Sequence, residues 1–113
     1  MRSQRSRRIK KGEYGCAVEA AFDMVGSKWK GAILFYLLDG KKRFNELRKL
    51  MPGITQRVLT LQLRELEQDN IIHRKVYPQV PPKVEYSLTE EGLALKPIIL
   101  ALREWGLKKF GKI

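Results

Sequence analysis

The sequence predicts a single, mainly α domain of the α+β class, in which several helices precede a β-hairpin and a long helix follows it. Three observations predict this order. Apolar residues recur at helical spacing in successive segments between residues 17 and 68. Apolar and polar residues alternate over residues 83–88, after a run rich in β-branched and aromatic residues at 71–77. Thr89 and two glutamates then open a last helical pattern, and 113 residues suit one domain.

The first two helices are expected at residues 17–25 and 28–39. In the first, apolar residues fall at i, i+3, i+4 and i+7 from Val18, and Gly26 ends it. Ser27 is the expected N-cap of the second helix, which is apolar nearly all round and is therefore the predicted central helix. Lys28 and Lys30 are read as lying either on a solvated face or at phosphate contacts.

A helix-turn-helix is expected next. A short helix begins near Phe44 and ends at Pro52-Gly53, and Thr55 caps a longer helix that reaches residue 68. Leu59, Leu63 and Leu66 give that helix its inner face, and Asp69-Asn70 closes it. Two helices joined by a tight glycine-containing turn are typical of a helix-turn-helix.

The C-terminal half completes a winged helix-turn-helix. Residues 78–82, Pro-Gln-Val-Pro-Pro, form the expected tip of the hairpin because proline cannot continue a central strand. The final helix is expected at 90–109, kinked or restarted at Pro97. Helix-turn-helix, two-stranded hairpin wing and flanking helices together define the predicted domain, residues 12–113.

The outer face of the helix at 55–68 carries side chains suited to reading base edges. Arginine pairs with guanine, glutamine with adenine, and threonine contacts bases through its hydroxyl or methyl group. The predicted base-reading set is Thr55, Gln56, Arg57, Thr60 and Arg64. Leu61 either contacts a thymine methyl group or packs under the neighbouring turn. The alternative for the whole set is an ordinary solvated helix surface.

The charge of the chain favours nucleic acid as the partner. The formal net charge is +11, and six cations without an acid lie in residues 1–11, read as a flexible basic arm or a solubilising tail. Seven further residues are predicted to meet the DNA backbone from the hairpin and from the segment before the short helix: Lys41, Lys42, Arg43, Arg74, Lys75, Gln79 and Lys83. Before the short helix, free backbone N–H groups are expected to help hold a phosphate. For the hairpin, a charged edge that avoids aggregation is the alternative.

Several stretches in one order resemble the HxlR-type bacterial transcription regulators from Cys16 to about Gly106. The stretches are Cys16-Ala17-Val18-Glu19, Gly26-Ser27-Lys28-Trp29, Arg43-Phe44-Asn45-Glu46-Leu47, Pro52-Gly53-Ile54, Leu63-Arg64-Glu65-Leu66-Glu67 and the run from Tyr77 to Thr89. The resemblance implies a homodimeric, cytoplasmic winged-helix regulator with a recognition helix at 55–68 and a wing at 78–83. Ala17 and Ser27 depart from the proline and glycine that are common in the family.

The resemblance also implies dimerisation largely through the first and last helices, 17–25 and 90–109, and the residues of the last helix agree with it. The last helix carries two apolar stripes, more apolar surface than one small domain needs, and a two-fold partner would bury it. The predicted interface is Val18, Phe22, Leu95, Ile98, Leu102 and Trp105.

Cys16, the one cysteine, is expected at the start of the first helix, near Lys10 and Lys11. Cations and a helix N-terminus favour a reactive thiol, and the resemblance implies an N-terminal cysteine that senses oxidants or electrophiles. Cys16 is therefore read either as such a sensor, acting between molecules, or as an inert packed residue. His73 lacks neighbours at ligand spacing, so no metal or cofactor is expected. No acid–base set that suggests catalysis is present, and no apolar run is long enough to span a membrane.

The sequence therefore predicts a homodimeric, sequence-specific regulator of double-stranded DNA that acts on a pseudo-palindromic operator, as a repressor rather than an activator, although no residue decides that sign. The residues specify no small-molecule effector. Two alternatives stay open: a basic architectural protein that coats nucleic acid without sequence choice, and a winged helix that binds an acidic protein partner.

Overall fold

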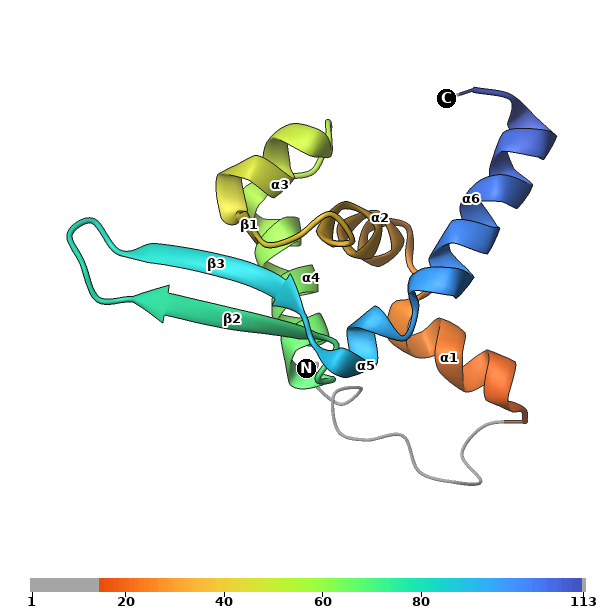
Figure 1. Cartoon of the computed structure of the whole chain (residues 1–113), viewed down its shortest axis with the longest axis horizontal. Coiled ribbons are helices and arrows are strands. Elements are labelled where there is room, and N and C mark those ends of the chain that lie inside the picture. The colour runs from red at the N-terminus through yellow and green to blue at the C-terminus, as the bar shows by residue number, and fades with distance from the viewer. Residues whose placement is uncertain (1–14, 113) are drawn as a thin grey trace.

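The elements of the fold follow one another along residues 15–112, the part of the chain that this computed structural model describes. In order they are α1 (Ala17–Val25), α2 (Lys28–Leu37), β1 (Lys42–Arg43), α3 (Phe44–Leu50), α4 (Gln56–Gln68), β2 (Ile72–Tyr77), β3 (Lys83–Leu88), α5 (Glu90–Leu93) and α6 (Lys96–Phe110). The β2–β3 hairpin projects from one end, and α1 and α6 lie at the other (Figure 1). The predicted winged helix-turn-helix is confirmed, whereas the basic arm expected at 1–11 lies outside the described residues.

Helix α2 is the centre of the core, as its all-round apolar pattern predicts. Ile33, Leu34 and Leu37 are at most 2% exposed, and α2 packs against α3, α4, α6 and β3. Ser27 caps the helix, because its Oγ accepts the backbone N–H of Lys30 at 3.2 Å. The helix ends at Leu37, two residues earlier than expected, and the chain turns at Gly40, whose φ of +133° favours glycine.

Helix α4 packs its predicted leucines against α2. Leu59, Leu63 and Leu66 are at most 2% exposed, and the hydroxyl of Thr55 caps the helix by accepting the Val58 N–H at 3.0 Å. Asn70 adopts the left-handed conformation, with φ of +62°, just after the helix. The expected inner face and both helix ends are confirmed.

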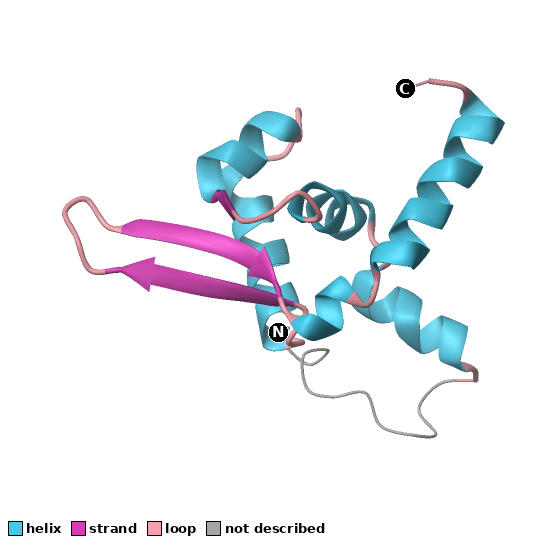
Figure 2. Cartoon of the chain, viewed as in Figure 1, coloured by secondary structure: helices cyan, strands magenta, loops and turns pink. Residues whose placement is uncertain are grey.

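The sheet has three antiparallel strands in the order β1-β3-β2, where the sequence predicted two (Figure 2). Lys42 of β1 lies opposite Tyr86 of β3, and Arg43 lies opposite Glu85. On the other side of β3, Lys75 of β2 lies opposite Glu85. Strand β1 was missed because two residues are too few to show an alternating pattern.

The C-terminal helical segment is divided in two, in agreement with a restart at Pro97. The Thr89 hydroxyl accepts the Gly92 N–H at 3.0 Å and donates to the main-chain carbonyls of Asn70 and Ile71. These contacts fix the start of α5 against the segment that follows α4. Helix α6 then begins with proline in its first turn. None of its side chains is buried within the protomer.

Candidate nucleic-acid interface

The outward face of α4 brings together four of the five side chains predicted to read bases, all except Thr55. Five residues border one shallow depression on this surface: Gln56, Arg57, Thr60, Leu61 and Arg64. Leu61 is 47% exposed, so it does not pack under the neighbouring turn. The depression therefore presents two guanidinium groups, one amide and one apolar side chain to the solvent.

The two threonines of the predicted set are partly occupied by helix contacts. The Thr55 hydroxyl accepts the Val58 N–H as the N-cap of α4. The Thr60 hydroxyl donates to the Gln56 carbonyl oxygen at 2.8 Å, which leaves its methyl group and an acceptor lone pair for another contact. Gln56, Arg57 and Arg64 consequently carry the free hydrogen-bonding capacity of this face.

One face of the sheet concentrates cations of the wing around a single carboxylate. The Tyr77 hydroxyl donates to Glu85 Oε1 at 2.9 Å. Lys41 Nζ lies 3.4 Å from Glu85 Oε1, and Lys83 Nζ lies 3.7 Å from Glu85 Oε2. The Tyr77 hydrogen bond and the two ammonium groups hold the pKa of Glu85 below its ordinary value. Lys75 Nζ completes the cluster, 4.9 Å from the centroid of the Tyr77 ring.

Arg74 lies apart from that cluster, although the sequence grouped it with Lys75 and Lys83. Since side chains alternate along a strand, Arg74 points to the opposite face of β2, where its Nε lies 3.3 Å from Glu67 Oε1 of α4. It shares a depression with Arg64 and Tyr86. Burial raises the pKa of Tyr86 above its ordinary value. Arg74 therefore extends the α4 surface rather than the wing.

The tip of the wing is open to solvent. Residues 78–82 are all exposed, Val80 to 98%, and the Gln79 N–H donates to the Tyr77 carbonyl oxygen at 2.9 Å. That turn leaves the Gln79 side chain exposed at the end of the hairpin, in the position expected from the sequence.

The structure contradicts the expected phosphate contacts at two groups, the Lys30 side chain and the Arg43 backbone N–H. Lys30 is not at a surface: its side chain is 4% exposed, and its Nζ lies 2.6 Å from Glu65 Oε1 of α4. The backbone N–H of Arg43 is not free for a phosphate either, because it donates to Glu46 Oε1 at 2.7 Å. Lys28 does stay at the surface, with Nζ 4.5 Å from the centroid of the Trp29 ring.

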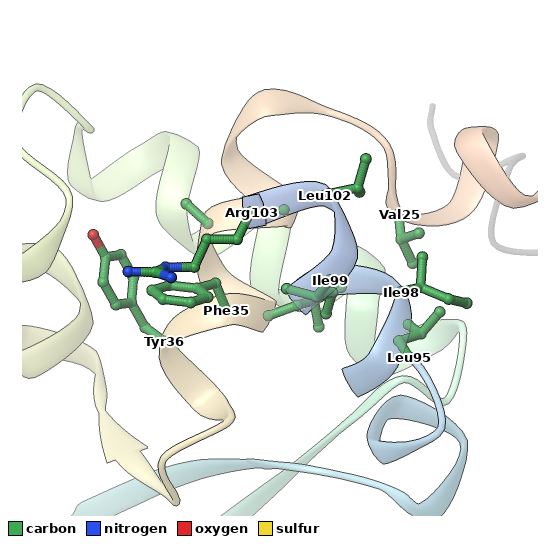
Figure 3. Close-up of a pocket in the computed structure, with 11 residues that line it drawn as sticks. Val25, Phe35, Tyr36, Leu95, Ile98, Ile99, Leu102 and Arg103 are labelled. Carbon is green, nitrogen blue, oxygen red and sulfur yellow. The ribbon is translucent and has the colours of Figure 1, made fainter. Parts of the chain in front are cut away.

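Helices α1 and α6 present a broad apolar surface at the end of the protomer opposite the wing. Val18, Phe22, Leu102 and Trp105 are each about 60% exposed, and Ile98 is 55% exposed. Between α2 and α6 this surface continues into an apolar groove of about 410 Å³ (Figure 3). Leu95, Ile98 and Leu102 line the groove, and Arg103 reaches across Phe35 towards Tyr36 at its edge (Figure 3). Arg103 was not singled out from the sequence because a charged residue directly after an apolar one on a helix is usually read as part of the solvent-exposed face.

Cys16 occupies the N-cap position of α1, as expected, and is exposed, so it is not a packed core residue in this protomer. Within residues 15–112, no group of three His, Cys, Asp or Glu side chains could hold a metal ion. In the same range no helix is long and apolar enough to cross a membrane.

A recognition helix beside a basic wing defines a DNA-binding domain of the winged helix-turn-helix class. Residues 24–112 match the family described as HxlR-like helix-turn-helix. This chain is 67% identical over 94 residues to YdeP, an uncharacterized HTH-type transcriptional regulator of Bacillus subtilis (strain 168), over 83% of this chain and 73% of YdeP.

Solved structures agree with this assignment. The redox regulator HypR in its oxidized form is 62% identical, with a TM-score of 0.79 over 82% of this chain and 96% of that chain. The reduced form of the transcriptional regulator YodB from B. subtilis is 41% identical, with a TM-score of 0.72 over 84% of this chain and 94% of that chain. This chain therefore belongs to the HxlR-like helix-turn-helix family and is a DNA-binding transcriptional regulator, not an enzyme.

Proposed function

We propose that this protein acts as a homodimer on a pseudo-palindromic operator and places one α4 helix of each protomer in a major groove. The exposed Gln56, Arg57 and Arg64 support this proposal most directly, because their helix has its opposite face fully buried. A helix fixed in this way can present the three side chains to base edges without refolding. The wing and the neighbouring strand β1 are proposed to meet phosphates of the flanking DNA through the exposed or half-exposed side chains of Lys41, Arg43, Lys75, Gln79 and Lys83. Lys42, opposite Tyr86, shares the other face of the sheet with Arg74 and is proposed to meet phosphate there.

The apolar surface of α1 and α6 supports the homodimer. Large apolar side chains that are more than half exposed, such as Phe22 and Trp105, are a liability in a free protomer. A second copy related by a two-fold axis would bury them and would set two α4 helices facing the same side of a duplex. Half-sites spaced by about 10 bp or a multiple of it follow from that symmetry.

Repression is the proposed outcome of binding. The described domain offers a DNA-binding end and an apolar end, and a dimer that holds an operator overlapping a promoter blocks the polymerase by occupancy alone. Because the proposed ligand is chromosomal DNA, we place the protein in the cytoplasm.

Selection of bound sequences from a random DNA library tests the proposed function. The expected result is an enriched, two-fold symmetric sequence that binds at least about 1,000 times more tightly than random DNA at one fixed salt concentration. Equal affinity for the enriched sequence and for random DNA would instead support a basic architectural protein that coats nucleic acid without sequence choice. If the protein binds no DNA from the library, the result would support a winged helix that binds an acidic protein partner.

A thiol response at Cys16 is the second proposal. The residue is exposed at the start of α1, and HypR, which is similar to this chain, is described as a redox regulator with oxidized and reduced forms. Since the sequence holds one cysteine, a disulfide must join two molecules. Two Cys16 thiols would lose two protons and two electrons to an oxidant such as diamide, which is reduced to the hydrazine.

Non-reducing electrophoresis with and without diamide tests that response. We expect a covalent dimer and a changed operator affinity in the natural protein, and neither in Cys16→Ser. A covalent dimer without any change in DNA affinity would mean that Cys16 is oxidised but is not a sensor.

A further inference from the structure

The sheet face that carries the wing lysines holds one acidic residue among the strand positions that the structure describes. Pairing of the strands places Lys75 directly opposite Glu85 on one side and Arg43 directly opposite it on the other. Lys83 lies two residues before Glu85 on the same strand and therefore on the same face. Glu85 thus lies in a field of cations that the proposed function assigns to DNA phosphates.

Glu85 forms ion pairs with two cations, Lys41 and Lys83, and restricts the positions of their ammonium groups. Each of its oxygen atoms faces an ammonium group: Lys41 at Oε1 and Lys83 at Oε2. The Tyr77 hydroxyl donates to Oε1 and fixes the carboxylate, and the Lys83 ammonium also lies 4.5 Å from the centroid of the Tyr77 ring. The side chain of Glu85 is only 12% exposed and that of Lys83 27% exposed, so water screens this pair less than it screens a free surface pair, whereas Lys41, at 63% exposed, is the more strongly screened and more weakly held partner.

We propose that Glu85, fixed by Tyr77, is a specificity-determining residue of the wing: it holds Lys41 and Lys83 in one arrangement and so suppresses sequence-independent binding to DNA. This inference rests on the proposed function, in which the wing meets phosphates while α4 reads bases. A carboxylate is chemically similar to a phosphate as a partner for ammonium groups, so it competes with any duplex for these two lysines.

The competition affects the two kinds of complex differently. On an operator, base contacts by α4 fix the position of the wing along the duplex, so lysines held in one arrangement meet phosphates in one fixed position. On random DNA no base contact fixes the wing, and lysines must reach towards whichever phosphates are near. Restricting Lys41 and Lys83 therefore penalises random DNA more than an operator, which is discrimination against the wrong partner.

The test compares natural protein with Glu85→Gln for binding to the selected operator and to random DNA over a series of salt concentrations. Glutamine keeps the size and the hydrogen-bond acceptor but removes the charge. We expect affinity for random DNA to rise, its salt slope to steepen by about 1 to 2 as the two lysines become free to replace counterions, and the operator-to-random ratio to fall roughly fivefold. Tyr77→Phe, which removes only the hydroxyl, should change the ratio in the same direction by less.

Two controls separate this role from a simple loss of negative charge. Glu90→Gln removes an equal charge from the exposed first turn of α5 and should leave the ratio unchanged. Lys83→Ala should reduce the random-DNA salt slope more in the Glu85→Gln protein than in the natural one, because only there is Lys83 free.

The outcomes are distinguishable. Equal effects of Glu85→Gln and Glu90→Gln, or a Lys83→Ala effect that does not depend on residue 85, would overturn the role of Glu85 while leaving the regulator intact. A natural protein without operator preference would overturn the proposed function instead. Circular dichroism and a thermal melt establish that each variant is folded, and Tyr77→Phe provides a second route should Glu85→Gln unfold.

Discussion

Lys30 Nζ lies 2.6 Å from Glu65 Oε1, and this ion pair joins the central helix α2 to the recognition helix α4 inside the protomer. The two side chains are 4% and 15% exposed. Nearby, the Ser27 hydroxyl donates to Gln62 Oε1 at 3.4 Å, so the first turn of α2 holds α4 through a second contact. The outward residues of α4 are thus oriented by polar contacts as well as by its leucines.

Replacing Lys30 with alanine is expected to lower the free energy of unfolding by about 3 kcal/mol, because it removes the cation that faces a largely buried carboxylate. Urea denaturation measures the loss. Lys28→Ala is the matched control, since Lys28 is exposed and contacts only the ring of Trp29 among the interactions described, and it should cost less than about 1 kcal/mol. Similar losses in the two variants would contradict a structural role for the Lys30–Glu65 pair.

The helices could be predicted from the sequence because each carries its own signals. Periodic leucines, the capping residues Ser27, Thr55 and Thr89, and the turn at Asn70 are local, and all of them lie where the pattern placed them. Pairing between distant segments has no such signal. Lys30 was read as a surface residue because a lysine next to an apolar stripe is usually solvated, and nothing local indicates its partner on α4.

The wing was predicted in outline, and its charge arrangement was not. The proline-rich tip and the alternating residues of β3 indicate a hairpin, but the register decides which cations share a face. That register puts Arg74 beside Glu67 of α4 and Lys75 beside Glu85. Glu85 and Tyr77 were consequently missed as site residues, although Tyr77 and Lys83 directly flank the proline-rich tip and Glu85 lies two residues after Lys83, a spacing that places all three on one face.

Arg57→Ala and Arg64→Ala are each expected to weaken operator binding by about 1–3 kcal/mol and to reduce the preference for operator over random DNA, because bidentate arginine contacts to guanine carry sequence information. Titration of both DNAs at one salt concentration measures this preference. Lys108→Ala removes a cation from the last turn of α6, far from α4, and should leave the ratio unchanged. Equal losses on operator and random DNA would mean that the two arginines contact phosphates and do not read bases.

Leu102→Asp is expected to convert the proposed dimer to a monomer, since a carboxylate on the apolar face of α6 would be buried without a partner in the interface. Sedimentation velocity without DNA measures the change, and operator affinity should fall with it because one protomer occupies one half-site. Val80→Asp places the same charge on a fully exposed apolar position at the tip of the wing and should leave the dimer intact. A dimeric Leu102→Asp protein would exclude this face of α6 from the interface.

Acid should reduce the contribution that Glu85 makes to the stability of the protein. The Tyr77 hydrogen bond, followed by the ammonium groups of Lys41 and Lys83, lowers the pKa of Glu85 in the folded protein below the ordinary value of 4.5. At neutral pH the carboxylate is ionised in both states and its native contacts are present. As the pH falls below about 4.5 the unfolded chain binds a proton first, so the contribution of Glu85 to stability declines until the folded pKa is passed.

Thermal melts of the natural protein and Glu85→Gln at pH 7 and at about pH 3.5 measure that contribution. The difference in melting temperature between the two proteins should be largest at pH 7 and smaller in acid, because glutamine cannot ionise. Tyr77→Phe keeps the carboxylate but removes the largest cause of the lowered pKa, so its melting temperature should be less affected by acid than that of the natural protein. A difference between natural protein and Glu85→Gln that is equal at both pH values would show that Glu85 keeps an ordinary pKa, and that its contacts with Tyr77 and the lysines do not favour the charged form.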